Sequence, residues 1–184
     1  MNVLNRRSVV LSLLSYGLGN TAMAKETLRI FQNYSPSLND PEHPSFDVFY
    51  HLSQLICCRE NLDKDGAQTM YLLMQQEPWG KKHISTAYTE IKNGLENRQS
   101  DASIADLVEA KEIGDGEAWF VSHILSTWYT GIYFHEAQPK QRILYDAALM
   151  WDVVGNYIAP PGTRILEPGS WANIPDEYLK KLKK

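Results

Sequence analysis

The sequence lacks the short motifs that identify most enzymes and cofactor-binding proteins. Its 184 residues contain no HExxH, no GxSxG, no glycine-rich phosphate loop and no CxxCH haem-attachment site. Cysteine is scarce, with two residues, and acidic pairs such as Asp63/Asp65 and Asp176/Glu177 lie in predicted turns or near the tail, where turn and cap roles suffice for them. We therefore expect no catalytic residues, no bound cofactor and no metal in this chain.

Clustered positive charge is also missing. Lysine and arginine number 18 against 22 acidic residues, which gives a formal net charge of −4. A nucleic-acid footprint needs grouped lysines and arginines, so the balance argues against nucleic acid as a partner. The one basic run, which ends the chain, is interpreted as a solvated terminus. It consists of Lys180, Lys181, Lys183 and Lys184.

Residues 1–24 have the pattern of a cleavable export signal. Arg6 and Arg7 precede a short apolar stretch, and Ala22 and Ala24 supply the small residues that a signal peptidase requires. Ten to twelve apolar residues are too few to cross a bilayer comfortably as a permanent anchor. Twin arginines directly before a moderately apolar run favour the twin-arginine translocation (Tat) route. A general secretory (Sec) signal whose first residues happen to hold two arginines is the alternative.

The rest of the chain predicts a small all-α bundle. Residues 25–44 are polar and rich in proline, asparagine and serine, so we expect an extended lead-in. Residues 45–184 form the expected domain, in which apolar residues recur at helical spacing and indicate about five to six helices. The predicted helices include a dense run over 46–56, stripes over 67–74, 84–95, 121–132 and 143–154, and a short helix after Asp101.

The C-terminal stretch from Pro160 to Pro175 is irregular, with four prolines and two glycines. Trp171 lies within it, and a tryptophan on a rigid proline and glycine scaffold is costly to leave in water. Either Trp171 folds back onto the bundle or it contacts a partner chain.

The histidines and cysteines of the sequence do not form a recognisable metal-binding or redox motif. The five histidines fall on different predicted elements, and we interpret them as surface or hydrogen-bonded residues rather than metal ligands. Cys57 and Cys58 are adjacent at the end of a predicted helix, where a disulfide between neighbours requires a strained ring. Three alternatives stay open for them: buried free thiols, a bond to a partner chain, or a vicinal disulfide.

Several blocks of the sequence resemble one family. The segment Ile124 to Gly131 is similar to an "IL-x-x-WY-x-G" stretch, and Tyr145 to Met150 is similar to a "YE-x-ALM" block. The segment from Pro168 to Pro175 resembles a closing "PG-x-W-x-x-x-P", and 46–62 resembles an opening helix. These blocks are typical of the small subunits of membrane-bound, FAD-dependent sorbitol, fructose and glucose dehydrogenase complexes.

The resemblance implies a non-catalytic subunit of a sugar or polyol dehydrogenase. In that family the small subunit binds a large flavoprotein without its own signal and escorts it, folded, through the Tat pathway to the periplasm. The large subunit holds FAD and an iron–sulfur cluster, and a multi-haem cytochrome c subunit (haem c) passes electrons onward at the outer face of the inner membrane. The matching positions give these expected partner contacts: Trp128, Tyr129, Gly131, Tyr145, Leu149, Met150, Pro168, Gly169 and Trp171.

The chain departs from the family in its cysteines. Many relatives place a cysteine shortly before the "PG-x-W" block, where it can bond the large subunit, and here that region has none. A covalent link to the partner must therefore use other residues or be absent. Two other functions remain open: a stand-alone periplasmic redox or metal-binding protein that uses Cys57 and Cys58, and a helical binding protein without a flavoprotein partner.

Overall fold

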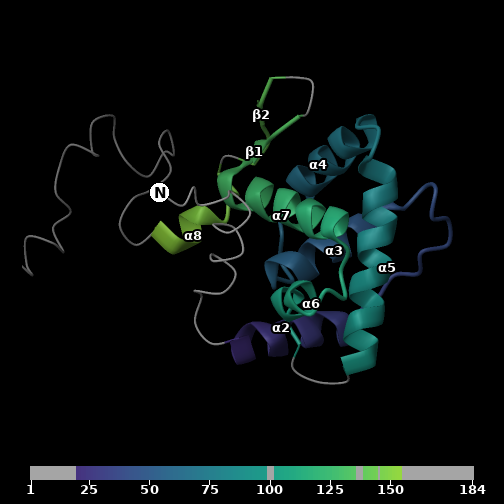
Figure 1. Cartoon of the computed structure of the whole chain (residues 1–184). Helices are drawn as coiled ribbons and strands as arrows, with labels where there is room; N and C mark the ends of the chain where they lie inside the picture. Colours follow the sequence, from purple (N-terminus) through teal and green to yellow (C-terminus); the bar gives the residue numbers. More distant parts are fainter. Residues whose placement is uncertain (1–19, 99–101, 136–138, 145, 155–184) are drawn as a thin grey trace, which may run out of the picture.

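The computed structural model describes residues 20–98, 102–135, 139–144 and 146–154 (Figure 1). These residues form seven helices and one two-stranded antiparallel sheet, so the predicted small all-α bundle is confirmed. None of the helices in these ranges is both long and apolar enough to cross a membrane. The helices are α2 (Asn20–Asn33), α3 (Phe46–Cys57), α4 (Lys64–Gln76), α5 (Gly80–Arg98), α6 (Ile104–Glu109), α7 (Asp115–Thr130) and α8 (Met150–Val154); the strands are β1 (Ile132–Tyr133) and β2 (Gln141–Arg142).

Local sequence signals set most of the helix ends. Ser45 and Asp63 precede α3 and α4, and their side chains accept hydrogen bonds from the backbone N–H groups of Val48 and Gly66. A capping box between Ser103 and Asp106 begins α6. Each cap satisfies an otherwise unpaired donor in the first helical turn.

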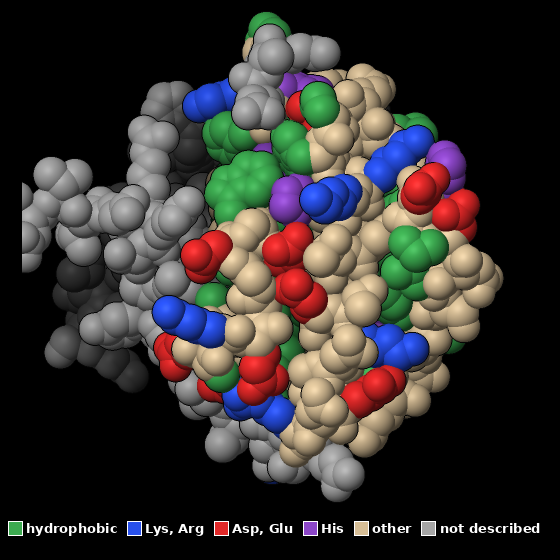
Figure 2. Space-filling model, turned by 45° about the vertical axis from the view of Figure 1, so that its right-hand side comes forward, with side chains coloured by type: hydrophobic (Ala, Val, Ile, Leu, Met, Phe, Trp, Pro, Cys, Tyr) green, Lys and Arg blue, Asp and Glu red, His purple; other side chains and the backbone are tan. Residues whose placement is uncertain are grey.

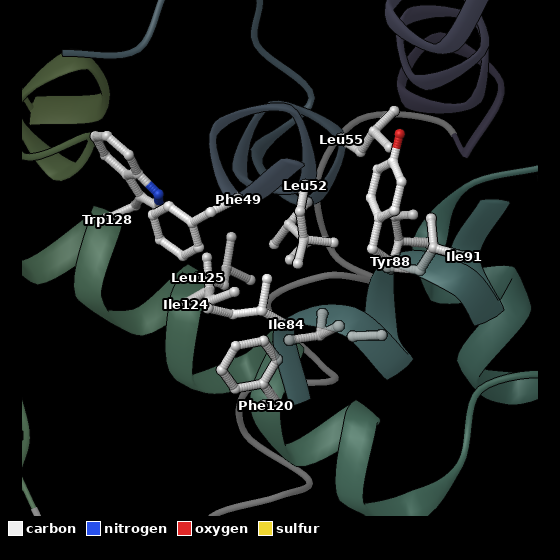
Figure 3. Close-up of a cluster of buried hydrophobic side chains, with 14 of the residues drawn as sticks. Phe49, Leu52, Leu55, Ile84, Tyr88, Ile91, Phe120, Ile124, Leu125 and Trp128 are labelled. Carbon is white, nitrogen blue, oxygen red and sulfur yellow. The ribbon is translucent and has the colours of Figure 1, made fainter. Parts of the chain in front are cut away.

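The core lies where α3, α5 and α7 meet (Figure 3). Phe49, Leu52 and Leu55 of α3 face Ile84, Tyr88 and Ile91 of α5 and a row on α7, all buried. The α7 row consists of Phe120, Ile124, Leu125 and Trp128. Because α3 packs against α2, α4, α5 and α7, it is the central helix of the bundle.

The expected extended lead-in over 25–44 is wrong in its first part, because α2 continues to Asn33. Ala24, Thr27 and Ile30 are buried, and their spacing of three places them on one helix face. Thr27 Oγ1 also lies 3.2 Å from Cys58 Sγ at the end of α3. Packing against the core therefore stabilises a helix in a segment whose composition favours none.

Residues 34–44 do form an irregular segment, which crosses the bundle between α2 and α3 and is called the tethered segment below. Three hydroxyl groups of α4 and α5 donate hydrogen bonds to proline carbonyls of this segment. Tyr88 bonds Pro36 at 2.7 Å, Ser85 bonds Pro41 at 2.6 Å and Tyr71 bonds Pro44 at 2.6 Å. The segment is thus fixed to the bundle by side chains rather than by a backbone ladder.

The helix expected over residues 143–154 is only partly present. The strand β2 ends at Arg142, just before this range, and within the range the described residues form a turn at 146–147 and the five-residue α8. The expected stripe over 121–132 likewise ends at Thr130, where α7 stops. Gly131 adopts a left-handed conformation with φ 68°, which turns the chain back on itself and begins the short hairpin.

Candidate partner interface

Two of the sequence blocks that resemble the small-subunit family lie against each other in the structure. The backbone N–H of Leu149 donates to the carbonyl of Trp128 at 2.9 Å, and the N–H groups of Ile143 and Leu144 donate to the carbonyl of Gly131. These bonds give partners to carbonyls that the end of α7 leaves without helical ones. The blocks therefore stabilise the folded chain itself at this junction.

The close approach of Leu144 and Ala148 to the end of α7 explains why residue 131 is a glycine. A Cβ at position 131 would lie 2.8 Å from the carbonyl oxygen of Leu144 and 3.2 Å from Cβ of Ala148. The left-handed φ of Gly131 disfavours any other residue as well. Gly131 is thus required by the internal packing of this chain.

Trp128 is fully buried between α7 and α3, beside Phe49 (Figure 3). Its indole has no surface left for a partner, so the expectation that Trp128 makes direct partner contact is corrected here to a core role. Leu149, at 7% exposure, is also a core residue. Met150 is half-buried at the start of α8.

Tyr129 is the expected interface residue that the described part of the chain exposes most, at 43%. It lies near Cys57 of α3 and near Arg59 and Asp152, which form an ion pair between the end of α3 and α8. Partial burial is the main cause that raises the pKa of the Tyr129 phenol. The hydroxyl therefore stays protonated at neutral pH and can donate a hydrogen bond at this surface.

Cys57 and Cys58 are free cysteines beneath this surface. Burial raises the pKa of the Cys57 thiol well above its ordinary value, and burial also raises the pKa of Cys58. Because the thiolate is the reactive form, both groups are poor nucleophiles at neutral pH. The arrangement gives no support to a stand-alone redox protein that acts through these two residues.

Several expected site residues lie outside the described part of the chain. They are Arg6 and Arg7 of the signal, Tyr145, and the C-terminal group Pro168, Gly169 and Trp171. Of the expected cleavage residues, Ala22 is exposed and Ala24 is buried, and both lie within α2.

Sequence reasoning missed a cluster of aromatic rings and histidines at the other end of α7, which we call the ring cluster. Trp79 and Trp119 meet edge to face with their centroids 5.1 Å apart, and Trp119 stacks on His123 at 5.6 Å. The cluster continues through further ring contacts. Its members are Trp79, His83, Trp119, Phe120, His123, Tyr133 and His135.

Two glutamates bind histidines at the edges of the ring cluster. His83 Nδ1 lies 3.1 Å from Glu117 Oε1, and His135 Nδ1 lies 3.1 Å from Glu77 Oε1. His123 lies between them, and burial is the largest cause that lowers its pKa. Within the described ranges, no group of three or more histidine, cysteine or carboxylate side chains is arranged to hold a metal ion.

The surface of the molecule brings hydrophobic and histidine side chains together (Figure 2). In that view they lie side by side in the upper part of the face, with lysine or arginine side chains close by. Among the large hydrophobic side chains, Trp119 is 41% exposed. A hydrophobic surface with aromatic members is typical of protein-binding sites.

Comparison with known families identifies the chain. The family model described as "Membrane bound FAD containing D-sorbitol dehydrogenase" matches residues 4–175 of the 184, whereas no curated protein matches. The match covers the N-terminal stretch, the whole described bundle and the C-terminal segment with Trp171. The chain therefore belongs to the membrane-bound, FAD-containing D-sorbitol dehydrogenase family, as a member of its small-subunit type.

Proposed function

We propose that this protein is the non-catalytic small subunit of a periplasmic FAD-dependent sugar or polyol dehydrogenase. The observation that carries the proposal is the family match over 4–175 on a chain whose described part is a helical bundle around an apolar core. In such a bundle the core positions are filled by side chains, and FAD belongs to a separate large subunit. The iron–sulfur cluster is assigned to that same subunit, and haem c to a cytochrome subunit.

The second part of the proposal concerns export. Arg6 and Arg7 lie directly before an apolar stretch, so the chain carries a Tat-type signal of its own. A flavoprotein acquires its cofactor by folding in the cytoplasm, and a partner that binds the folded state can carry it through the Tat translocase. The small subunit then also stabilises the flavoprotein, because a ligand that binds only the folded state shifts the folding equilibrium toward it.

The partner contacts divide into two groups. Tyr129 and Met150 lie at the described surface near the end of α7, and Pro168, Gly169 and Trp171 remain proposed contacts in the C-terminal segment. Trp and Tyr bury large rigid areas at low entropic cost, which suits both groups to a stable interface.

Replacement of both signal arginines by lysine tests the export proposal. Arg6→Lys/Arg7→Lys keeps the charge but removes the twin-arginine pair, so both this chain and the flavoprotein should stay in the cytoplasm. Cell fractionation with immunoblots of both chains is the measurement. Lys25→Arg, a conservative change outside the signal, is the control. Normal periplasmic amounts of the double variant would assign the signal to the Sec route instead.

A further inference from the structure

The outward face of α7 has no charge over most of its length. Residues 118–135 contain no aspartate, glutamate, lysine or arginine, although α7 lies at the surface of the bundle (Figure 1). Surface helices normally carry charged residues on the side that faces water. Asp115, in the first turn, is the one carboxylate in line with this face. The exposed face of α7 therefore differs from that of an ordinary surface helix, and contact with a partner would explain the difference.

Aromatic side chains stand at both ends of this face, with small residues between them. Trp119, Ser122, Ser126 and Tyr129 follow the helical repeat and lie on one side of α7. Trp119 and Tyr129 are 41% and 43% exposed, and ten residues separate them by about 15 Å along the axis. Ser122 and Ser126 are half-buried and leave a low strip between the two rings.

Two hydroxyl groups on or beside the face are already bonded within α7. Ser122 Oγ donates to the carbonyl of Ala118 at 3.0 Å, and Thr130 Oγ1 donates to the carbonyl of Ser126 at 2.7 Å. A partner that covers the face therefore leaves these hydroxyl groups satisfied. The penalty for removing water from these two hydroxyl groups is correspondingly small.

The exposed tryptophan is held in place before any partner arrives. Trp119 stacks on His123 with an interplanar angle of 22° and meets Trp79 at 82°. Such contacts fix the ring orientation, so little rotamer entropy is lost when a partner covers it. The rigid ring at one end and Tyr129 at the other give the face two anchor points.

Polar side chains at the two ends of the face have close partners. His83 Nδ1 lies 3.1 Å from Glu117 Oε1 near Trp119, and Arg59 forms an ion pair with Asp152 near Tyr129. An uncharged centre with paired polar groups at its rim is the anatomy of a protein–protein interface. A lipid surface or a nucleic acid would instead need lysine or arginine on the face itself.

We infer that the outward face of α7, from Trp119 to Tyr129, is a docking surface for a folded protein partner, the large flavin subunit. The inference rests on the proposed function, to which it adds the location of the contact. A stable complex buries about 800 Å² on each partner, so this face forms the centre of a larger contact area that Trp79 extends. An apolar or aromatic ridge of the partner fits the strip over Ser122 and Ser126.

Co-purification of the full chain with the large flavin subunit of its proposed complex tests the inference. Ser126→Arg places a long charged side chain in the middle of the strip and should reduce the amount of co-purified flavoprotein at least tenfold. Thr69→Arg is the control, because it places the same charged side chain at an exposed hydroxyl residue of another helix, α4. It should leave co-purification unchanged. Circular dichroism and melting temperature check the fold of both variants.

A second pair of variants keeps the test valid if Ser126→Arg does not fold. Trp119→Ala and Tyr129→Ala should each weaken co-purification about tenfold or more, as is typical of aromatic anchors. Leu72→Ala, at an exposed hydrophobic residue of α4, is their control and should have no effect.

The outcomes separate this inference from the proposed function. If the wild-type chain does not co-purify the flavoprotein, the proposed function fails, and the docking surface fails with it. If the wild-type chain binds and all the α7 variants bind equally well, the docking surface is elsewhere while the proposed function stands. If the chain alone is a dimer on size-exclusion chromatography and Ser126→Arg makes it monomeric, a second copy covers the face, and the assignment to the flavoprotein is overturned.

Discussion

Trp128 and Trp119 lie on the same helix, yet Trp128 is fully buried and Trp119 is 41% exposed. Trp128 belongs to the block that resembles the small-subunit family, and it packs against Phe49 in the core. Trp119 lies outside that block and faces outward with Tyr129. The comparison teaches that a recognisable motif can mark the residues that build the fold, while the residues that meet a partner lie beside it.

Replacement of the buried tryptophan should have the largest effect. Trp128→Ala leaves a large cavity between α3 and α7 and should lower the free energy of unfolding by about 3–5 kcal/mol. Trp119→Ala, on the other face, should lower it by about 1 kcal/mol or less, because much of that ring is already in water. Urea unfolding followed by circular dichroism measures both. Equal losses would contradict the division of α7 into a core face and a surface face.

The glycine at the end of α7 should give an intermediate effect. Gly131→Ala forces a Cβ to within 2.8 Å of the Leu144 carbonyl and strains a left-handed residue, at a cost of about 1–3 kcal/mol. Gly116→Ala at the other end of α7 is the control. That added Cβ meets only the His83 ring at 3.3 Å, so we expect a change within about 1 kcal/mol of wild type. Thermal unfolding measures both variants. A lower melting temperature for Gly116→Ala than for Gly131→Ala would contradict the close packing of Leu144 against Gly131.

Lowering the pH should reduce the stability of the fold gradually, by protonating His123 in the ring cluster, and this loss should be smaller than those of the variants above. Burial lowers the pKa of His123 below the ordinary value of about 6.5, so the unfolded chain binds the proton more readily. The contribution of His123 to stability is therefore fully present above pH of about 6.5 and is lost as the pH falls below it. His51 of α3, whose pKa burial also lowers, changes stability in the same direction.

Melting temperatures of the wild type and of His123→Gln, measured between pH 8 and pH 5, isolate the loss of stability that is due to protonation of His123. The variant should lose less stability on acidification than the wild type. Parallel curves for the two proteins would show that the charge on His123 does not matter to folding.

The bundle itself could be predicted from the sequence, because its core helices have dense apolar stripes. The stripes over 46–56, 67–74, 84–95 and 104–108 correspond to α3, α4, α5 and α6. The helix α2 escaped prediction because its buried face consists of small or polar residues such as Ala24 and Thr27, and its composition resembled a linker. The hairpin escaped because each of its strands has two residues, too few for an alternating pattern.

The candidate interface was less predictable for a different reason. Periodicity identifies the inward positions of a helix, and the family blocks indicate Trp128 and Tyr129 but not Trp119. Trp119 lies outside those blocks, and the contacts of Trp79, His83 and His123 join elements that are far apart in sequence. The signal that could have indicated the face is the uncharged run over 118–135, which is unusual for a helix with exposed positions.

The tethered segment has a consequence for how the molecule opens. Its three hydroxyl bonds to Pro36, Pro41 and Pro44 contribute about 1 kcal/mol each, far less in sum than the core contributes. Because no backbone ladder joins it to the helices, the segment can detach as a unit while α3, α5 and α7 stay packed. Detachment removes the bond between Tyr88 and Pro36 and releases the exposed backbone at 39–43 from the bundle, so a protease can cleave this stretch while the core stays folded.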